Sequence, residues 1–526
     1  MSYSTLLVAL LQPEFVADVE QLANDIRDVI HEQEDELIRT VIGLVLGEVT
    51  PVAMMEVEVS LAAILRECGR RLVEEAVNRI EPDDAAQLPD ALTINGDTHT
   101  PNATKTPHSD VCCYFGKITL FRFGWRTPDH TGPTTFPLEE SLGLIRGCTP
   151  ALAERAAWLA GNAGATQRLV IERLKKDHNV SIGHARLRAL WKELSERLEP
   201  FRRQQQARRI VELLTQADAS RGRCRPVLAV GRDGVTVGEQ PHGFFEVATC
   251  ATVTVYDRRG KRLGTVYLGY APQLGQDTMT TELKLLLEEI FKLWTGRLPR
   301  LCYVTDCGSQ EEAFYRRDLC HMRHPVTKKR LSWQRIVDFY HATLRLATIA
   351  KSLKLDETQA RAWQRRMRGV LLEKNGVKRV LMSAAALRKQ YKLKPGTLDD
   401  FTTAINYLRK RTKWMRYDQY RRQHLPIGSG VTEAGCKTVF TQRAKLSGMR
   451  WKKEGLQVIL TFRMLIVSDV WSATWSESLR ESDPPRITTY PQAQGRPSRF
   501  QPRNSRKTTA SDRSYPSAVQ LSNRCR

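Results

Sequence analysis

Five runs of apolar, mostly β-branched residues constrain the fold of this chain more than any other feature. The runs lie at 224–235, 244–257, 261–272, 301–306 and 333–341. The RRGK turn (258–261) joins the second run to the third, whereas an amphipathic helix (280–294) and a second helix near Glu311 separate the later ones. Three meandering strands, then helix, strand, helix and strand, is the element order of an RNase H-like core. We therefore expect an α/β protein with a mixed sheet.

Three acidic residues stand beside glycines: Asp233 in AVGRDGV, Asp306 in LCYVTDCGS and Glu433 in IGSGVTEAGCK. We predict that Asp233 and Asp306 end the first and fourth strands, and that Glu433 lies on a helix. The ends of adjacent parallel strands lie side by side, so these carboxylates can converge. Carboxylates suit Mg²⁺ or Mn²⁺, and two such ions can act on both oxygens of a phosphoryl displacement. In this prediction Asp233 bridges two ions, Asp306 binds one and Glu433 reaches the other.

Each acid also has a purely structural interpretation. Asp233 precedes Gly234 and suits a hairpin turn, Asp306 suits a helix cap, and Glu433 suits the first turn of a helix. A further pair, Asp338 and His341, closes the fifth run. We predict that both lie near the metals, with His341 contacting a phosphate. The alternative is a packed histidine beside a surface acid.

The charge of the chain is divided unevenly along its length. The formal net charge is +23, yet residues 1–100 carry 20 acidic and 6 basic residues, a net of −14, which leaves +37 on residues 101–526. A field of this size favours a polyanion, so we expect nucleic acid as a partner, with a solvated basic surface as the alternative. The 11 cysteines form no CxxC pair, and no apolar run of about 20 residues is present. We therefore expect a cytoplasmic protein with reduced thiols and no membrane span.

A helix–turn–helix is predicted between residues 166 and 194. A first helix, a polar turn near Asn179 and a basic second helix follow one another there. Arg186 and Arg188 on the second helix are the predicted DNA contacts, although helical hairpins with basic faces also form by packing alone. An alternating stretch at 112–126 predicts a short hairpin.

Residues 342–425 are predicted to form a basic helical insertion before Glu433. Its aromatic residues suit either base stacking or the helical core. After Glu433, Lys437 lies one helical turn further on the same face, where it can grip a phosphate. The following basic residues are predicted to hold DNA; they are Arg443, Lys445 and Arg450.

The chain thus divides into seven predicted parts, which differ in composition and periodicity. They are an acidic helical region (1–90), a linker with a short β-ribbon (91–149, the linker itself covering 81–108), a helix–turn–helix region (150–222), the first part of the catalytic core (223–341), the helical insertion (342–425), the last part of the core (426–475) and a disordered basic tail (476–526).

Several motifs resemble one known family. GRDGV, VTDCGS, DFYHA and, above all, PIGSGVTEAGCKTVFTQRAKLSGMRW are similar to the ISKra family of bacterial insertion-sequence transposases, in the DDE superfamily. The resemblance covers roughly residues 110–470. It implies an RNase H-like catalytic domain, divalent-metal catalysis and recognition of terminal inverted repeats in double-stranded DNA. It matches Asp233, Asp306 and Glu433 to the DDE acids, and Asp338 with His341 to the D-x2-H signature of related groups.

The resemblance implies a transposase that cuts at element ends and joins them to target DNA. It also implies a homo-oligomer in the synaptic complex and a nucleoid-associated place in a bacterial cytoplasm. Two alternatives remain open at this point: a structure-specific endonuclease with the same fold, and a non-catalytic DNA-binding regulator.

Overall fold

A computed structural model describes residues 19–241, 243–481 and 487–489 of the chain. Most of these residues lie in helices. The helices are α3 (Val19–Leu46), α4 (Pro51–Asn78), α5 (Pro137–Ser141), α6 (Pro150–Gly161), α7 (Gln167–His178), α8 (His184–Ala219), α9 (Asp277–Leu293), α10 (Ser309–Arg317), α11 (Phe339–Ser352), α12 (Glu357–Leu371), α13 (Gly376–Gln390), α14 (Leu398–Arg411), α15 (Tyr417–Arg422), α16 (Gly430–Cys436), α17 (Gln442–Ala444), α18 (Lys453–Val467) and α19 (Trp471–Arg480). A π-helical turn at Lys437–Thr441 joins α16 to α17.

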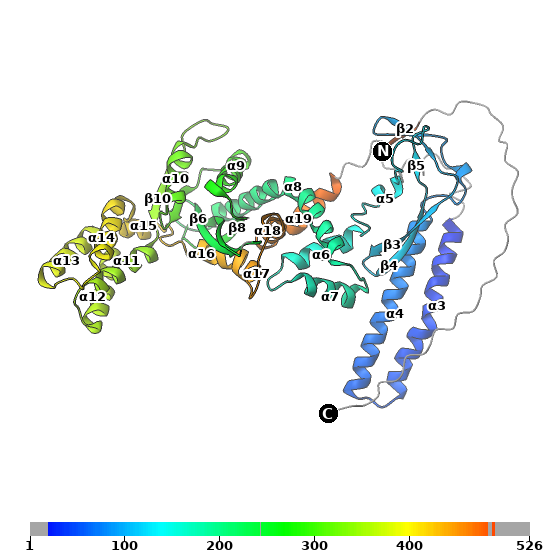
Figure 1. The fold of residues 1–526 in the computed structure, drawn as a ribbon, viewed down its shortest axis with the longest axis horizontal. Coiled ribbons are helices and arrows are strands. Elements are labelled where there is room, and N and C mark those ends of the chain that lie inside the picture. The colour runs from blue at the N-terminus through cyan, green and yellow to red at the C-terminus, as the bar shows by residue number, and fades with distance from the viewer. Residues whose placement is uncertain (1–18, 242, 482–486, 490–526) are drawn as a thin grey trace.

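Eleven strands form three sheets within the described residues. The strands are β1 (Leu92–Ile94), β2 (Asp97–Pro101), β3 (Thr106–Cys113), β4 (Gly116–Arg122), β5 (Trp125–Arg126), β6 (Val227–Gly238), β7 (Phe245–Tyr256), β8 (Arg262–Tyr270), β9 (Arg300–Thr305), β10 (Trp333–Val337) and β11 (Ile487–Thr489). In Figure 1 the largest sheet lies near the middle of an elongated molecule, with the α3–α4 hairpin toward one end and α11–α14 at the other.

The central sheet has the strand order β10-β9-β6-β7-β8. β6, β7 and β8 pair antiparallel, whereas β9 pairs parallel with both β6 and β10. The five strands and the intervening helices predicted between residues 224 and 341 are therefore confirmed, and the protein is of mixed α/β class.

Side chains alternate between the two faces of this sheet and so create two cores. On one face, Val227, Cys302 and Ile336 are fully buried against the helices that follow β10. On the other face, Leu228 and Tyr303 are fully buried against α8 and α9, together with their neighbours. Each fully buried aliphatic side chain contributes about 1.5–3 kcal/mol. Burial on both faces explains why these strands read as continuous apolar runs.

The predicted linker at 81–108 is wrong from Leu92 onward. β1, β2 and the start of β3 lie there, and β1 pairs with β2 and, distantly in sequence, with β11. Leu92 and Ile94 are buried, whereas their neighbours are polar. This polar composition led to the linker prediction, although threonine is a good strand former. The predicted hairpin at 112–126 is confirmed by the pairing of β3 with β4.

The helical prediction for the N-terminal region is confirmed by α3 and α4 but extends too far, because α4 ends at Asn78. The helical prediction for 342–425 and the two helices flanking a turn at 179–183 are confirmed. The predicted disordered tail begins too early, because α19 extends to Arg480 and β11 pairs with β1. Buried Trp471, which contacts Phe462 edge-on, anchors α19. The rest of the predicted tail, 482–486 and 490–526, lies outside the described residues, as do residues 1–18 of the acidic region.

No single helix in the described part of the chain is long and apolar enough to cross a membrane. α18 and α19 meet that test only together, and they are bent by 112°.

Candidate functional site

The register of the central sheet brings three aspartates to one level. Val230 on β6 is the parallel partner of Tyr303 on β9, so Asp233 and Asp306, each three residues further on, reach the same height. Val337 on β10 is the partner of Thr305, and Asp338 follows it by one residue. Because side chains alternate, all three aspartates share the face of Ala229 and Val304.

Asp233 itself lies inside β6 rather than at its end, which corrects the prediction. β6 runs on to Gly238 because its antiparallel partner β7 accompanies it there, with Cys250 opposite Asp233. Only the parallel pairing with β9 stops at Val230. Asp233 is therefore just beyond the end of the parallel ladder, and the hairpin-turn interpretation of Asp233 and Gly234 is also wrong.

The Asp233 carboxylate has few partners to balance its charge. The Gly234 N–H donates to it at 2.7 Å, and the Cys436 thiol lies 3.7 Å away. Burial raises the pKa of Asp233, the Gly234 hydrogen bond opposes this, and the charge of Asp306 raises the pKa further. Two carboxylates that repel each other in a partly buried place are a set of donors suited to a cation.

Helix α16 carries Glu433 across this face of the sheet. The approach is close because β6 has a glycine beneath the helix: a Cβ at Gly231 would lie 1.9 Å from Thr432 Oγ1. The Thr432 hydroxyl is hydrogen-bonded to that of Thr252 on β7 at 2.8 Å. Cys436, one turn after Glu433, is the residue that meets Asp233. Glu433 and Cys436 are thus on neighbouring positions of one helical face.

Asp338, His341 and Glu433 form a tight cluster. Each offers a possible metal-ligand atom, and these atoms lie within 4.8 Å of one another. His341 Nδ1 is 3.6 Å from Asp338 Oδ1 and 3.8 Å from Glu433 Oε1. The Asp338 carboxylate raises the pKa of His341, burial opposes it, and the charges of Asp306 and Glu433 add to the increase. A histidine with this environment favours its cationic form.

Asp338 is fully buried, so the alternative of a surface acid is wrong. Its carboxylate caps α11 by accepting from the His341 N–H at 2.8 Å, and it also accepts from the N–H and hydroxyl of Ser429. Ser429 Oγ in turn lies 3.1 Å from Glu433 Oε1. Burial works to raise the pKa of Asp338, but these hydrogen bonds outweigh it and the net shift is downward. Three of roughly four acceptor positions are taken, which makes Asp338 a positioning residue for His341 and Glu433.

Glu311 is a further acid that the sequence analysis did not predict. It lies in the first turn of α10, is buried, and its carboxylate is near Gly308, the residue two places after Asp306. Burial raises the pKa of Glu311, as do the charges of Asp306 and Asp233, while Arg232 lowers it. The sequence does show an acid at the start of a predicted helix, five residues after Asp306. This position alone does not indicate a functional role, because acids are common in the first turn of a helix, where the helix dipole favours them.

The helical insertion is joined directly to the loop after β9. The Tyr407 hydroxyl donates to the Asp306 carbonyl at 2.8 Å, and Arg411 donates to the Cys307 carbonyl at 3.1 Å. The aromatic residues proposed for base stacking are core residues instead. Tyr417 and Tyr420 are buried, and Trp363 and Trp414 belong to the same apolar cluster.

The predicted basic contacts fall into two groups. Arg188, Lys437, Lys445 and Arg450 are exposed. Arg186 is half-buried and is held by the side chain and carbonyl of Asp110 and by the Arg146 carbonyl at 2.9 Å. Arg186 therefore ties α8 to β3 and is not a free cation on the surface.

Arg443 is buried, which contradicts its predicted contact with DNA. Its Nε donates to the Ala160 carbonyl at 2.6 Å, near the end of α6. Burial, and then the charge of Arg463, lower its pKa to about 10. Arg463 donates to the adjacent Gly161 carbonyl at 3.2 Å. Two internal arginines thus satisfy the last carbonyls of α6 and join it to the helices that follow Glu433.

Replacement of Arg443 by Ala should destabilise the protein by about 2 kcal/mol, because the Ala160 carbonyl loses its partner and a cavity remains. Chemical unfolding followed by circular dichroism measures the loss. Lys445→Ala, two residues away and exposed, is the matched control and should leave the unfolding midpoint unchanged. Equal midpoints for the two variants would contradict the internal role of Arg443.

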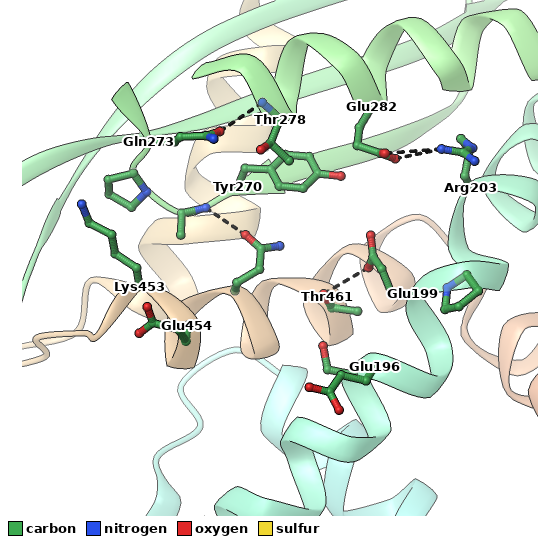
Figure 2. Close-up of a pocket in the computed structure, with 15 residues that line it drawn as sticks. Glu196, Glu199, Arg203, Tyr270, Gln273, Thr278, Glu282, Lys453, Glu454 and Thr461 are labelled. Atoms are coloured by element: carbon green, nitrogen blue, oxygen red, sulfur yellow. Dashed lines mark hydrogen bonds and ion pairs between the residues drawn. The ribbon is translucent and has the colours of Figure 1, made fainter. Parts of the chain in front are cut away.

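A cleft of about 790 Å³ lies elsewhere, between α8, α9 and α18 (Figure 2). Glu199 and Glu282 on its walls hold Arg202 at 2.6 and 3.3 Å, and Glu282 also holds Arg203 at 3.3 Å. Its acids are therefore balanced by arginines. None of the residues of the acidic site lines it.

Comparison with known proteins adds no assignment. Neither a protein-family model nor a curated protein sequence matches this chain.

Proposed function

We propose that this protein is a DDE transposase that binds the terminal inverted repeats of an insertion sequence and catalyses DNA cleavage and strand transfer. The observation that carries the proposal is the common height and common face of Asp233 and Asp306, with α16, the helix that carries Glu433, packed on the same face so that its Cys436 meets Asp233. Three elements that carry carboxylates, β6, the loop after β9 and α16, thus meet where the parallel pairing of β6 and β9 ends. Such an arrangement suits phosphoryl transfer.

The strand order supports an RNase H-like core. That fold is expected to begin with a three-stranded antiparallel meander. Its first strand pairs parallel with the fourth strand, and the fourth pairs parallel with the fifth, as β6, β9 and β10 do here. The helices α11–α15 interrupt the chain between β10 and Glu433, as the resemblance to ISKra transposases implies.

Mg²⁺ or Mn²⁺ is the metal that fits this donor set. The candidate ligands Asp233, Asp306 and Glu433 offer only oxygen atoms, and burial, together with the charge of Asp306, raises the pKa of Asp233. When bound, such ions acidify the attacking hydroxyl and stabilise the leaving oxygen. In the protein itself, Ser429, which is hydrogen-bonded to Asp338, orients Glu433, and His341 Nδ1 lies 3.8 Å from the Glu433 carboxylate.

Exposed cations near Glu433 suit contact with DNA phosphates. Lys437, Lys445 and Arg450 follow Glu433 along the chain, and Arg188 lies on α8 after the turn at 179–183. We propose that these four contact DNA and that Arg186 acts by holding α8 in place. Binding of two element ends by a homo-oligomer in the bacterial cytoplasm belongs to the same proposal.

A supercoiled-plasmid assay tests the function. The plasmid carries the DNA that flanks the gene, including its inverted repeats. With Mg²⁺, the protein should release 3′-hydroxyl ends and join them to a target plasmid, and removal of the metal by EDTA should abolish both products. Cleavage without joining, on branched DNA and without dependence on the repeats, would instead indicate a structure-specific endonuclease. Binding to the repeats without any product would indicate a regulator.

A further inference from the structure

The distal half of the α3–α4 hairpin exposes apolar side chains in an unusual number. Val45, Leu46, Val49 and Val52 around the tip are 72%, 81%, 77% and 59% exposed. Single exposed apolar residues are ordinary, but a contiguous group of this kind marks a surface that is covered in the functional state.

The exposed residues follow a helical period. On α4, Val52, Met55 and Val59 recur at i, i+3 and i+7, and all are exposed, whereas the i+12 residue Ile64 lies on another side of the helix and is buried. Each helix therefore has apolar residues beyond those that join α3 to α4. Helices that are apolar on more than one side belong inside a larger bundle.

The proximal half of the hairpin is already occupied. Asn78 of α4 exchanges hydrogen bonds with β4, donating to the Thr119 carbonyl at 2.9 Å and accepting from the Phe121 N–H at 2.7 Å. Arg79 pairs with Asp25 of α3 at 2.5 Å. In Figure 1 the hairpin projects from this attachment, and its tip stands away from the rest of the described chain.

Segments of this chain outside the described residues do not suit the tip as an occupant. Residues 1–18 join α3 at Val19, and the tip lies 27 residues further on, roughly 40 Å along the helix, whereas a helix of 18 residues spans about 27 Å. Residues 490–526 are basic and lack an apolar period. Neither segment can supply an apolar helix that reaches Val45 and Val52.

Charge favours a second copy of the same hairpin. Between residues 37 and 55 the only charged residues are Arg39 and Glu48, which have opposite signs, so two copies can meet there without repulsion. The acidic residues precede this segment on α3 and follow it on α4. An acidic helix pair is poorly suited to an anionic membrane, whose amphipathic ligands carry basic residues.

We propose that the distal half of the α3–α4 hairpin is a self-association surface, which joins two copies of this chain through a four-helix arrangement. This surface is distinct from the acidic site and does not depend on its chemistry.

Sedimentation velocity of the full chain over a range of concentrations tests the proposal. The wild-type protein should form a dimer at micromolar concentration. Substitution of Val45, Leu46, Val49 and Val52 together by Ser should weaken association by roughly a hundredfold, because the centre of the interface is lost. The control with Glu36→Ser and Glu58→Ser, exposed acids of the same hairpin, should still dimerise. A wild-type protein that stays monomeric, or a fourfold variant that dimerises equally well, would overturn the proposal.

Photo-cross-linking gives a second readout that does not depend on the stability of the variant. A photoreactive residue at Val49 should yield a covalent dimer whose cross-linked peptide falls within residues 30–65. Cross-links confined to residues 1–18 of the same chain, or a monomer that floats with phosphatidylcholine vesicles, would contradict self-association.

Discussion

Replacement of Asp233 by Asn, or of Asp306 by Asn, should abolish strand transfer while leaving the protein folded. Both side chains keep their size, but the site loses half of a carboxylate pair that lies at one height on one face of the sheet. Metal ions held by such acids contribute several kcal/mol to catalysis, which corresponds to roughly a thousandfold loss of rate. The measurement is the rate of product formation from a plasmid that carries the element ends.

The same variants make a prediction about stability that separates a functional role from a structural one. Because burial and the Asp306 charge raise the pKa of Asp233, its ionised form destabilises the folded protein at neutral pH. Asp233→Asn should therefore melt at or above the wild-type temperature in the absence of metal. Asp400→Asn, at an exposed acid of α14, is the control for both rate and melting. Normal strand transfer by Asp233→Asn would remove this residue from the site.

Substitution of Gly231 by Ala should also lower activity strongly, although Gly231 bears no functional group. The added Cβ would lie 1.9 Å from Thr432 Oγ1, so α16 must move away from the sheet and Glu433 must move with it. Overpacking of this kind costs about 1–3 kcal/mol of stability, and the displaced acid should reduce the rate by roughly tenfold to a hundredfold.

A compensating variant makes this second experiment specific. Thr432→Ala removes the oxygen that collides with the new methyl group, so the double variant Gly231→Ala, Thr432→Ala should recover activity and stability relative to Gly231→Ala alone. Thr432→Ala by itself loses the bond to Thr252 and measures that separate cost. A double variant as impaired as Gly231→Ala would show that the close approach of α16 does not govern the site.

The order of elements in the core was predictable, whereas the limits of individual strands were not. Apolar runs and turns are local, so they identified the five strands between residues 224 and 341. Asp233 was misplaced because a strand ends where its partners end, and β7 accompanies β6 further than β9 does. The strands at 92–113 could not be predicted, because their polar faces have the composition of a linker.

Charged and aromatic residues were harder to assign, since their environment is tertiary. Arg443 and Arg186 lie in basic stretches typical of DNA contacts. Each instead binds a partner that is distant in the sequence: Arg443 binds the Ala160 carbonyl and Arg186 binds Asp110. The sequence is equally consistent with Tyr417 stacking on a base and with Tyr417 lying in the helical core. Only the packing of the folded chain shows that it is buried. Asp338 was correctly associated with His341, but its capping of α11 and its bonds to Ser429 depend on a loop about 90 residues later.

The hydrogen bonds from Tyr407 and Arg411 to the loop after β9 have a consequence for engineering. Helices α11–α15 do not form a cassette that can be exchanged or trimmed independently, because α14 carries two of the donors that hold the backbone at Asp306 and Cys307. A chimaera must keep both donors with that loop. A partner that displaces α14 would therefore also displace the main chain at Asp306, because these two hydrogen bonds connect them. The insertion is thus mechanically coupled to the site.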